Sequence, residues 1–572
     1  MDVRTSQITF EDVPETWERL GGRALGARIL LDEVPATCDP LGPHNKLIFA
    51  PGTLVGHMVS SCDRISVCGK SPLTGGVKEA NAGGTTALKL AWLGIHALII
   101  EGQPTDPQAR SLLYLSKDDA RLEPADDPST GSGQGLAGLG VHATAEQLMV
   151  RFGPKVGLAI IGPAGEMQMA AAGIVHLDND QVPGRISARG GLGALMGSRG
   201  LKAIVINDAG TKMPSLVDRD LFNDARKRYT KSLQEHPQTN EIYPLYGTPG
   251  MVAMCNAKGG LPTRNFSAGR FEYAEQISGE LLHDLIAERG GEGVHDHACM
   301  AGCIIRCSNV FADTHGKTIV SPLEYETIGL LGSNLGIDSL DVVGELNAQA
   351  NDLGLDTIEI GAALGVAAEA GLMEWGDGER ALEMLGEVRR GTILGRALGG
   401  GAGLAGRVLG VSRIPVVKNQ AISAYDPRAI KGTGVTYATS PQGADHTAGL
   451  TIRANVDHTN PEGQAKLSRR SQISMAGYDS LGICVMGGFG FARDLTMIRD
   501  LVNGRYGWGV GDNYLKEIGQ ETLRLEREFN RQAGFNEVDD RLPEWMTEEP
   551  LAPLNTVFDV PAEDLDTIFD QL

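Results

Sequence analysis

The sequence has no excess of positive charge, no long apolar run and few aromatic residues. It holds 72 aspartates and glutamates against 51 lysines and arginines, a net charge of −21, and aromatic residues make up 5% of the chain. A nucleic-acid partner is not expected, because phosphate binding needs a basic surface. No stretch reaches the roughly 18 uninterrupted apolar residues of a membrane helix, so membrane insertion is not expected.

The sequence also lacks the marks of a secreted protein. Its opening, MDVRTSQITFEDV, is polar and has no apolar core like that of a signal peptide. The eight cysteines of such a chain are expected as reduced thiols rather than disulfides. We therefore expect a cytoplasmic protein.

Glycine is abundant, at 76 of 572 residues, and the length predicts about three domains. Short apolar runs bounded by turn residues, such as NKLIFAPG and LKAIVIND, predict a β-rich domain over residues 1–208. Apolar residues at helical spacing predict two mainly α-helical domains, 209–412 and 413–572, and an α+β fold class. The last clear helix is predicted with Asp512 as its N-cap and Gly534 as its stop.

Four cysteines are candidates for one site. Cys299, Cys303 and Cys307 follow at four-residue spacing, and Cys484 lies far downstream. Clustered thiolates in a non-secreted protein usually hold iron–sulfur or zinc. A triplet with a distant fourth ligand matches a [4Fe–4S] cluster, whereas structural zinc sites favour two close pairs. Buried unligated thiols are the third alternative, and we expect them for the four isolated cysteines, Cys38, Cys62, Cys68 and Cys255.

Two similar glycine loops lie far apart, NDLGLD at 351–356 and DSLGIC at 479–484. Glycine permits a tight turn, and the acidic side chains beside it can accept hydrogen bonds from a ligand rich in N–H groups. A helix that ends at a glycine C-cap can have the same sequence pattern, so the pattern alone does not indicate a binding loop. The second loop, however, ends at the candidate ligand Cys484.

This combination resembles the tungsten-containing aldehyde ferredoxin oxidoreductase family. Blocks in the family's order include GKSPLTGG, ANAGG, IGPAGE, RGGLGALMGSRGLKAI, LEYETIGLLGSNLGI and AYDPR, and the resemblance covers residues from about 20 to 535. It implies a β-rich base domain with two mainly helical domains closing over it and the cofactor at the interface. The implied cofactors are a tungsten (or molybdenum) bis-pterin, magnesium bridging the pterin phosphates, and a [4Fe–4S] cluster.

The resemblance also implies roles for particular residues. The cluster ligands would be Cys299, Cys303, Cys307 and Cys484, and Glu326 and His446 would handle protons near the metal. Carbonyls of Asn81 and Ile186 would bind the magnesium. The implied cofactor-binding set is Arg64, Asn81, Ala82, Gly83, Gly84, Arg185, Ile186, Asp352, Leu355, Asp356, Asp479 and Ile483.

The implied reaction is oxidation of an aldehyde to a carboxylic acid, with electrons passing through the cluster to ferredoxin or an iron–sulfur partner subunit. Two alternatives stay open: a catalytic subunit that reduces an acyl-CoA or other carbonyl substrate, and a non-catalytic iron–sulfur electron carrier. Without the resemblance, Glu326 would be interpreted as a solvated acid at the start of a helix, and His446 as a loop histidine with its hydrogen bonds satisfied. Without the resemblance, RGGLGALMG could be interpreted as a dinucleotide-binding loop, because glycines that open a helix can hold a pyrophosphate. No clear strand precedes it, however, and its spacing is not G-x-G-x-x-G.

The sequence departs from the family pattern at three places. Three residues, rather than two, separate Cys299 from Cys303, which a loop can absorb. Asn351 stands where relatives have an acid. Glu345 is followed at i+3 by Ala348 instead of the histidine of a subunit-bridging iron site, so oligomers are possible but without that iron.

Overall fold

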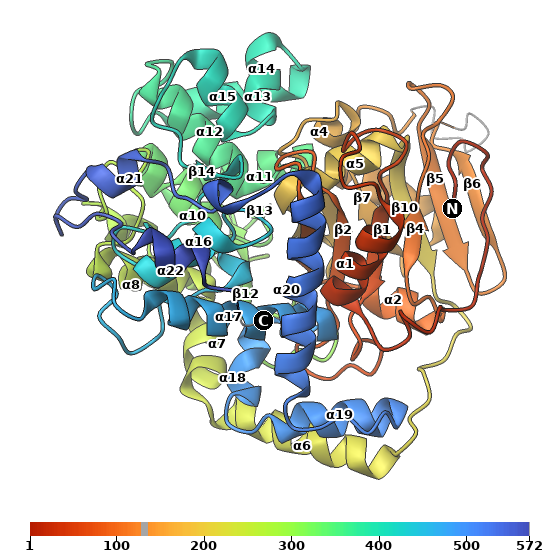
Figure 1. Cartoon of the computed structure of the whole chain (residues 1–572). Helices are drawn as coiled ribbons and strands as arrows, with labels where there is room; N and C mark the ends of the chain where they lie inside the picture. Colours follow the sequence, from red (N-terminus) through yellow and green to blue (C-terminus); the bar gives the residue numbers. More distant parts are fainter. Residues whose placement is uncertain (127–134, 571) are drawn as a thin grey trace.

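The computed structural model describes residues 1–126, 135–570 and 572. Its N-terminal part contains two large β-sheets, and the remainder is mainly helical (Figure 1). The predicted α+β class, with the β-rich part first, is confirmed. Within the described ranges no helix is long and apolar enough to cross a membrane.

The first sheet has four antiparallel strands in the order β3-β2-β1-β4. These are β1 (Leu47–Pro51), β2 (Ile65–Lys70), β3 (Val77–Ala82) and β4 (Leu98–Ile100). Helix α1 (Gly22–Glu33) covers one face, and it lies very close because Gly26 has no side chain. A Cβ at Gly26 would stand 2.1 Å from the Cys68 Sγ of β2.

The second sheet has the strand order β6-β5-β10-β7-β8-β9. Its strands are β5 (Ser111–Ser116), β6 (Ala120–Pro124), β7 (Gly157–Ile160), β8 (Ile174–Leu177), β9 (Pro183–Ser187) and β10 (Leu201–Asn207). One hydrophobic cluster joins the two sheets, with Phe49 and Val67 from the first and Ile204 from the second. Helices α2 (Thr86–Trp92), α3 (Val141–Phe152), α4 (Pro163–Glu166) and α5 (Leu192–Ser198) complete this part.

A strand does precede the RGGLGALMG segment. Residues 183–187 form β9, which the sequence did not reveal because the run GRIS is short and half polar. β9 pairs antiparallel with β8, whereas a dinucleotide loop follows a strand of a parallel sheet. The dinucleotide alternative therefore has no structural support.

The remainder of the described chain is built from helices and two small sheets. The first contains β11 (Val294–His297), β12 (Ser308–Ala312) and β13 (Thr318–Val320), and the second contains β14 (Val416–Val417) and β15 (Gln420–Ala421). The helices that bear on the site are α6 (Arg219–Glu235), α10 (Tyr325–Leu331), α11 (Leu340–Leu353), α12 (Thr357–Glu369), α15 (Ala402–Leu409), α16 (Lys431–Thr439), α17 (Gln464–Leu481), α18 (Gly488–Phe491), α19 (Thr496–Tyr506) and α20 (Tyr514–Ala533). Others are α7 (Tyr243–Tyr246), α8 (Met251–Lys258), α9 (Gly279–Arg289), α13 (Gly378–Arg390), α14 (Ile393–Gly399), α21 (Trp545–Glu548) and α22 (Ala562–Asp566).

Helix α20 is the predicted last helix of the chain, and its two ends give different outcomes for the predicted N-cap and stop. Gly534 terminates the helix in the left-handed conformation, as predicted. The predicted N-cap is wrong: Asn513 takes that position without a side-chain hydrogen bond to the helix. Asp512 pairs instead with Arg499 of α19, so its carboxylate is not free to cap.

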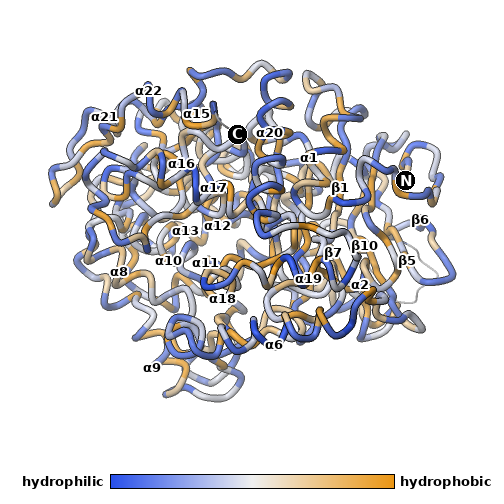
Figure 2. Tube along the Cα trace, turned by 60° about the horizontal axis from the view of Figure 1, so that its bottom comes forward, coloured by the Kyte–Doolittle hydropathy of each residue, from blue (hydrophilic) through white to orange (hydrophobic). Residues whose placement is uncertain are grey.

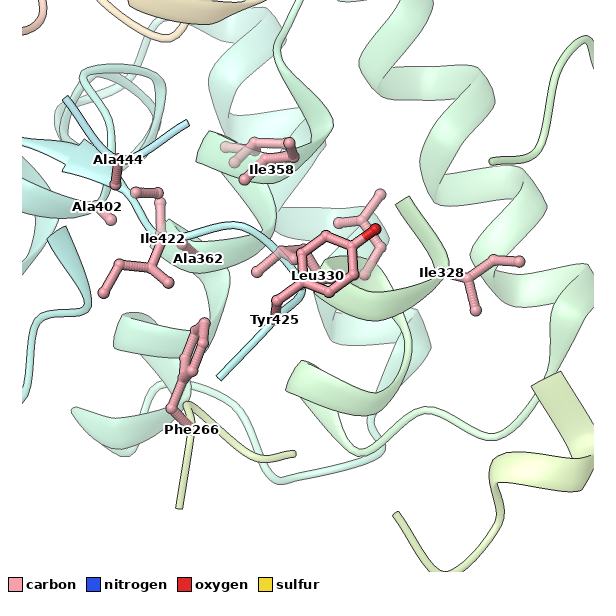
Figure 3. Close-up of a cluster of buried hydrophobic side chains, with 14 of the residues drawn as sticks. Phe266, Ile328, Leu330, Ile358, Ala362, Ala402, Ile422, Tyr425 and Ala444 are labelled. Carbon is pink, nitrogen blue, oxygen red and sulfur yellow. The ribbon is translucent and has the colours of Figure 1, made fainter. Parts of the chain in front are cut away.

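One hydrophobic core extends through both predicted helical domains. Phe266, Ile358 and Ala362 from the first lie with Ile422 and Ala444 from the second in a single buried cluster (Figure 3). The core therefore continues across residues 412 and 413, and the separation into two helical domains stays a prediction.

Buried ion pairs connect the N-terminal helix α1 to the C-terminal part of the chain. Arg23 donates from Nε and Nη2 to the Glu526 carboxylate of α20, at 2.7 and 2.8 Å, and contacts Asp479 Oδ2 at 3.2 Å. All three side chains are buried. In Figure 1, α20 accordingly runs alongside α1.

Candidate active site

A cavity of about 330 Å³ lies where the N-terminal sheets meet the helices. Strands β3 and β9 supply one wall, α10 and the loop between α11 and α12 another, and residues 445–447 a third. The predicted site residues that line it are Arg64, Asn81, Ala82, Gly83, Arg185, Ile186, Cys299, Glu326, Leu355, Asp356 and His446.

Arg64 and the end of β3 form the sheet side of the cavity. Arg64 donates from Nε to Asn81 Oδ1 and from Nη2 to the Asn81 carbonyl at 3.2 Å. Gly83 lets the backbone pass the thiols, because a Cβ there would lie 3.2 Å from Cys299 Sγ. Gly84 lies just outside the cavity, with a φ of +101° that favours glycine.

Arg185 on β9 presents an unused donor. Its Nη2 donates to Ser308 Oγ at 2.6 Å and its Nη1 lies 3.6 Å from Glu324 Oε1. Its buried Nε has no hydrogen-bond partner within the described part of the chain. A buried donor left over at a cavity wall fits an anionic ligand.

The NDLGLD segment runs from the last turn of α11 into the connection before α12, and it places two of its predicted residues at the cavity and one outside. Leu355 and Asp356 line it, together with Asn351. Asp356 caps α12 by accepting from the Ile358 amide at 3.0 Å, and it pairs with Arg189 at 3.2 Å. Asp352 points away, where it accepts from the His142 amide at 3.1 Å and pairs with Arg389.

The second loop lies behind the cavity rather than on its wall. Asp479 is buried against Arg23, and burial together with the Glu79 charge raises its pKa well above the usual range. Ile483 is fully buried in a separate hydrophobic cluster. Arg64 connects this loop to the cavity, because the charges of Asp479, Cys484 and Cys299 all act on its guanidinium.

The four predicted ligand cysteines come together, all as half-buried free thiols. Burial raises the pKa of Cys299 to about 12, and the pKa of Cys307 well above its usual range. Thiolates at Cys303 and Cys484 would raise the pKa of both further, because the four cysteines lie near one another. Among the residues described, no His, Cys, Asp and Glu group is arranged to hold a single metal ion. A four-iron cluster instead holds its thiolates apart, on separate irons.

The triplet lies in a loop, which absorbs the added residue. Residues 298–307 contain no helix, and Gly302 takes a φ of +72° between Cys299 and Cys303. Met300 and Ile305 are each 1% exposed and fix the loop to the core. The structure therefore supports the expectation that a loop accommodates the additional residue between Cys299 and Cys303.

Cys62 is a fifth thiol at this position, and the sequence prediction treated it as isolated. It is buried, donates to the Ser60 carbonyl at 3.2 Å, and feels the charges of Cys484 and Cys303. Its position two residues before Arg64 was the one feature of the sequence that could have indicated its place beside the other thiols. The other cysteines predicted to be unligated, Cys38, Cys68 and Cys255, are free thiols too.

Glu326 and His446 face each other at the cavity. His446 Nε2 lies 3.4 Å from Glu326 Oε1, an oxygen without a hydrogen bond inside the described structure. The other oxygen accepts from the Ala424 amide at 2.8 Å. Burial raises the pKa of Glu326, and the His446 charge opposes that rise.

A network behind His446 was not predicted from the sequence. Ser423 Oγ lies 3.1 Å from His446 Nδ1 and accepts from Arg189 Nη1 at 3.0 Å. Lys78 on β3 pairs at 2.7 Å with Asp445, the neighbour of His446. Although burial opposes it, the Lys78 and Arg189 charges hold the pKa of Asp445 well below its usual range.

Comparison with known proteins identifies several similar chains. A family model described as aldehyde ferredoxin oxidoreductase, N-terminal domain, matches residues 1–208, and one for domains 2 and 3 matches residues 224–570. A tungsten-containing aldehyde ferredoxin oxidoreductase of Pyrococcus abyssi is 33% identical over 96% of this chain and 90% of its own. An aliphatic sulfonate oxidoreductase, WOR-like subunit, of Pyrococcus furiosus is 25% identical over 89% and 81%.

A solved structure has the same overall fold. It is the active site complex BamBC of benzoyl coenzyme A reductase with 1,5-dienoyl-CoA, with a TM-score of 0.81 over 100% of this chain and 92% of its own. The sequence identity is 20%, so this match bears on the fold alone.

Proposed function

Because this chain belongs to the aldehyde ferredoxin oxidoreductase family of tungsten-containing oxidoreductases, we propose that it oxidises an aldehyde to a carboxylic acid. The reaction consumes one water and releases two protons and two electrons. Cys299, Cys303, Cys307 and Cys484 would hold a [4Fe–4S] cluster, which would supply a one-electron path to ferredoxin or an iron–sulfur partner subunit.

One observation carries the proposal. Glu326 and His446, which can exchange protons, line the same cavity as Cys299 and Arg64, which adjoin the thiol group. Proton removal and electron exit can therefore act on one bound substrate from two walls. A non-catalytic electron carrier would need the thiols but not the acid–base pair.

The cavity residues fit a tungsten (or molybdenum) bis-pterin. Arg185 Nε supplies a free buried donor for a phosphate, and Arg64 and Asp356 supply a second donor and an acceptor. Carbonyls of Asn81 and Ile186 would hold the magnesium. The bound metal–pterin group supplies the two-electron chemistry.

Glu326 is suited to receive a proton. Its Oε1 faces the cavity side without a hydrogen bond, and burial raises its pKa toward the range in which a carboxylate is an effective base. His446 Nε2, 3.4 Å away, is placed to stabilise the carboxylate and to pass a proton onward.

Ser423 is placed to influence which nitrogen of His446 carries the proton, because its hydroxyl accepts from Arg189 and lies 3.1 Å from His446 Nδ1. When the serine donates to Nδ1, the neutral imidazole carries its proton on Nε2, facing Glu326. When both nitrogens carry protons, the imidazolium charge lowers the pKa of Glu326. Ser423 and Arg189 are thus positioning residues for the acid–base pair.

The test is anaerobic purification followed by metal analysis and an aldehyde panel with a viologen dye as electron acceptor. We expect tungsten or molybdenum, about four irons per chain, and aldehyde-dependent dye reduction. Absence of both heavy metals, or far less iron, would overturn the proposal. Dye-coupled turnover with acyl-CoA substrates but not with aldehydes would favour the carbonyl-reducing alternative.

A further inference from the structure

Two neighbouring serines, Ser60 and Ser61, connect the cysteine triplet to the fourth predicted ligand. The amide of Ile304, the residue after Cys303, donates to Ser60 Oγ at 3.1 Å. The Cys484 amide donates to the Ser61 carbonyl at 2.7 Å. Both serines are buried, with exposed fractions of 5% and 1%. The pair therefore holds together two ligand-bearing segments that are distant in sequence.

The Ser61 hydroxyl also reaches one of the predicted ligand sulfurs. Its Oγ lies 3.5 Å from Cys303 Sγ, which is within hydrogen-bonding distance for sulfur. A cysteine that binds iron is a thiolate, and a thiolate has no hydrogen to donate. Ser61 must therefore be the donor whenever Cys303 is a ligand.

Ser60 is placed to strengthen that bond. Its Oγ already accepts from the Ile304 amide, so its own hydrogen is free for Ser61 Oγ, 3.3 Å away. The three bonds then run in one direction, from the amide through both hydroxyls to the sulfur. Hydrogen bonds in such a chain polarise one another, and each becomes stronger than it would be alone.

The backbone at Ser61 is strained, and the contact with Cys303 explains why. Ser61 has a φ of +61°, in the left-handed region, which costs about 1–2 kcal/mol for a residue with a side chain. Glycine would adopt this conformation without that cost and would present the same carbonyl to Cys484. The carbonyl alone therefore does not account for a side chain at this position, whereas the hydroxyl beside Cys303 does.

The surroundings of the thiols are apolar. Cys303 and Cys307 pack against a hydrophobic cluster that includes Val59, Ile305 and Ile483. Helices α6, α18 and α19 contribute much of this cluster, and they lie side by side in both Figure 1 and Figure 2. A hydrogen bond in such surroundings is stronger than one in water, because little solvent screens it. A single hydroxyl can therefore change the energy of a charged group beside it.

We infer that the hydroxyls of Ser60 and Ser61 raise the reduction potential of the iron–sulfur cluster by donating to the sulfur of Cys303. The inference rests on the proposed function, which supplies the cluster. Reduction adds one electron and makes the sulfurs more negative, so a donor to one of them stabilises the reduced form more than the oxidised form. Ser61 acts on the cluster through Cys303, so it is a positioning residue.

The experiment is a redox titration of the anaerobically purified holoenzyme with mediator dyes. The electron paramagnetic resonance signal of the reduced cluster measures the reduced fraction at each potential. The test variants are Ser61→Ala and Ser61→Gly, which both remove the hydroxyl but differ in backbone strain. The control is Ser198→Ala on α5, which removes a buried hydroxyl that donates to the Leu195 carbonyl at 2.8 Å.

At the potential that leaves the wild-type cluster half reduced, the ratio of reduced to oxidised cluster should fall about fivefold in both Ser61 variants, as expected for the loss of one hydrogen bond. It should fall less in Ser60→Ala, which keeps the Ser61 hydroxyl but removes the neighbour that polarises it. It should stay at the wild-type value in Ser198→Ala. The glycine variant should unfold at a higher temperature than the alanine variant, because glycine relieves the strain at residue 61.

The outcomes separate this inference from the proposed function. A wild-type protein with far fewer than about four irons per chain contradicts the proposed function. A wild-type cluster whose potential is unchanged or higher in both Ser61 variants overturns the inference, and so does a fall in only one of them, which would assign the change to the backbone. Loss of iron from both variants also overturns it, because residue 61 would then hold the loop rather than set the potential.

Discussion

Glu326 keeps one carboxylate oxygen without a hydrogen bond among the described residues, although it is buried at a cavity wall. A buried oxygen without a hydrogen-bond donor lowers the stability of the fold unless a bound ligand or a transferred proton interacts with it. Its neighbour Glu324, two residues earlier, is already engaged with Thr248 and Arg185. The structure therefore distinguishes Glu326, which keeps a free acceptor, from Glu324, which does not.

Glu326→Gln should lower the rate of aldehyde oxidation by about 10²–10⁴-fold, because it removes the proton acceptor without changing side-chain volume. Metal content should stay at the wild-type level. Glu345→Gln, on the exposed side of α11, is the control and should retain full activity. Near-normal turnover by the Glu326→Gln variant would exclude Glu326 as the base.

His446→Asn should move the acidic limb of the pH–rate profile to higher pH. Burial raises the pKa of Glu326 and the His446 charge opposes it, so removing that charge raises the pKa further. Glu326 works as a base only when ionised, and the ionised fraction then appears at higher pH. The measurement is kcat/KM against pH, with a variant of the exposed His315, His315→Asn, for comparison. An acidic limb that stays in place or moves to lower pH would refute the pairing.

Ser423→Ala should reduce kcat about tenfold and leave KM for the aldehyde nearly unchanged, because it alters the imidazole proton position rather than substrate binding. Ser423→Thr keeps the hydroxyl and should restore most of the rate. If threonine does not rescue, the serine acts through packing alone.

Single residues of this kind were the hardest to predict. Ser423 and Lys78 belong to no motif that the sequence displayed, and Arg189 opens the block RGGLGALMG without any sign of its role. Their contacts span hundreds of residues, as in the 234 between Arg189 and Ser423. The motif residues were easier, because loops such as ANAGG have a recognisable pattern. Asp352 shows the limit: it shares that kind of pattern but points away from the cavity.

At the scale of elements, glycines set how closely helices approach their neighbours. Gly26→Ala in α1 should lower the apparent unfolding temperature, because the new Cβ would lie 2.1 Å from Cys68 Sγ and overpacking costs about 1–3 kcal/mol. Gly386→Ala in α13 should raise it, since that Cβ meets only Arg390 at 3.4 Å and alanine favours helix by about 1 kcal/mol. Equal effects in thermal scans of the two variants would contradict this account.

Elements were predictable where local signals agreed. The run NKLIFAPG, predicted as a strand, is β1, and helix α6 begins at a typical N-cap, with Asp218 accepting from the Leu221 amide. The cap of α20 was mispredicted because Asp512 has a tertiary partner in Arg499, which local sequence does not show. β9 was missed for a similar reason, since its neighbour β8 rather than its own composition stabilises it.

At the scale of the whole molecule, Arg23 joins the first helix to two elements near the other end of the chain. Arg23→Leu should destabilise the protein by about 3–5 kcal/mol, because Glu526 and Asp479 would stay buried without their cation. The pKa of Asp479, which burial already raises well above its usual range, would then rise further, because the Arg23 charge opposes that rise. The loss of stability should therefore be smallest at low pH and should grow as pH rises from the usual range of an unfolded aspartate toward that raised pKa.

Thermal unfolding of the Arg23→Leu variant across pH measures this trend. The double variant Arg23→Leu/Glu526→Leu removes one of the stranded charges and should regain part of the loss. A loss of stability that is the same at every pH would mean that it comes mainly from lost side-chain packing and not from the unpaired charges.

The ion pair between Lys78 and Asp445 spans 367 residues of sequence. At a synthesis rate of about 5–20 residues per second, roughly 20–70 s separate the emergence of its two partners from the ribosome. Throughout that interval the strand that carries Lys78 exists without the histidine loop that it anchors. The cavity therefore lacks the wall formed by residues 445–447 until that loop has been synthesised, so it is completed late in the production of the chain.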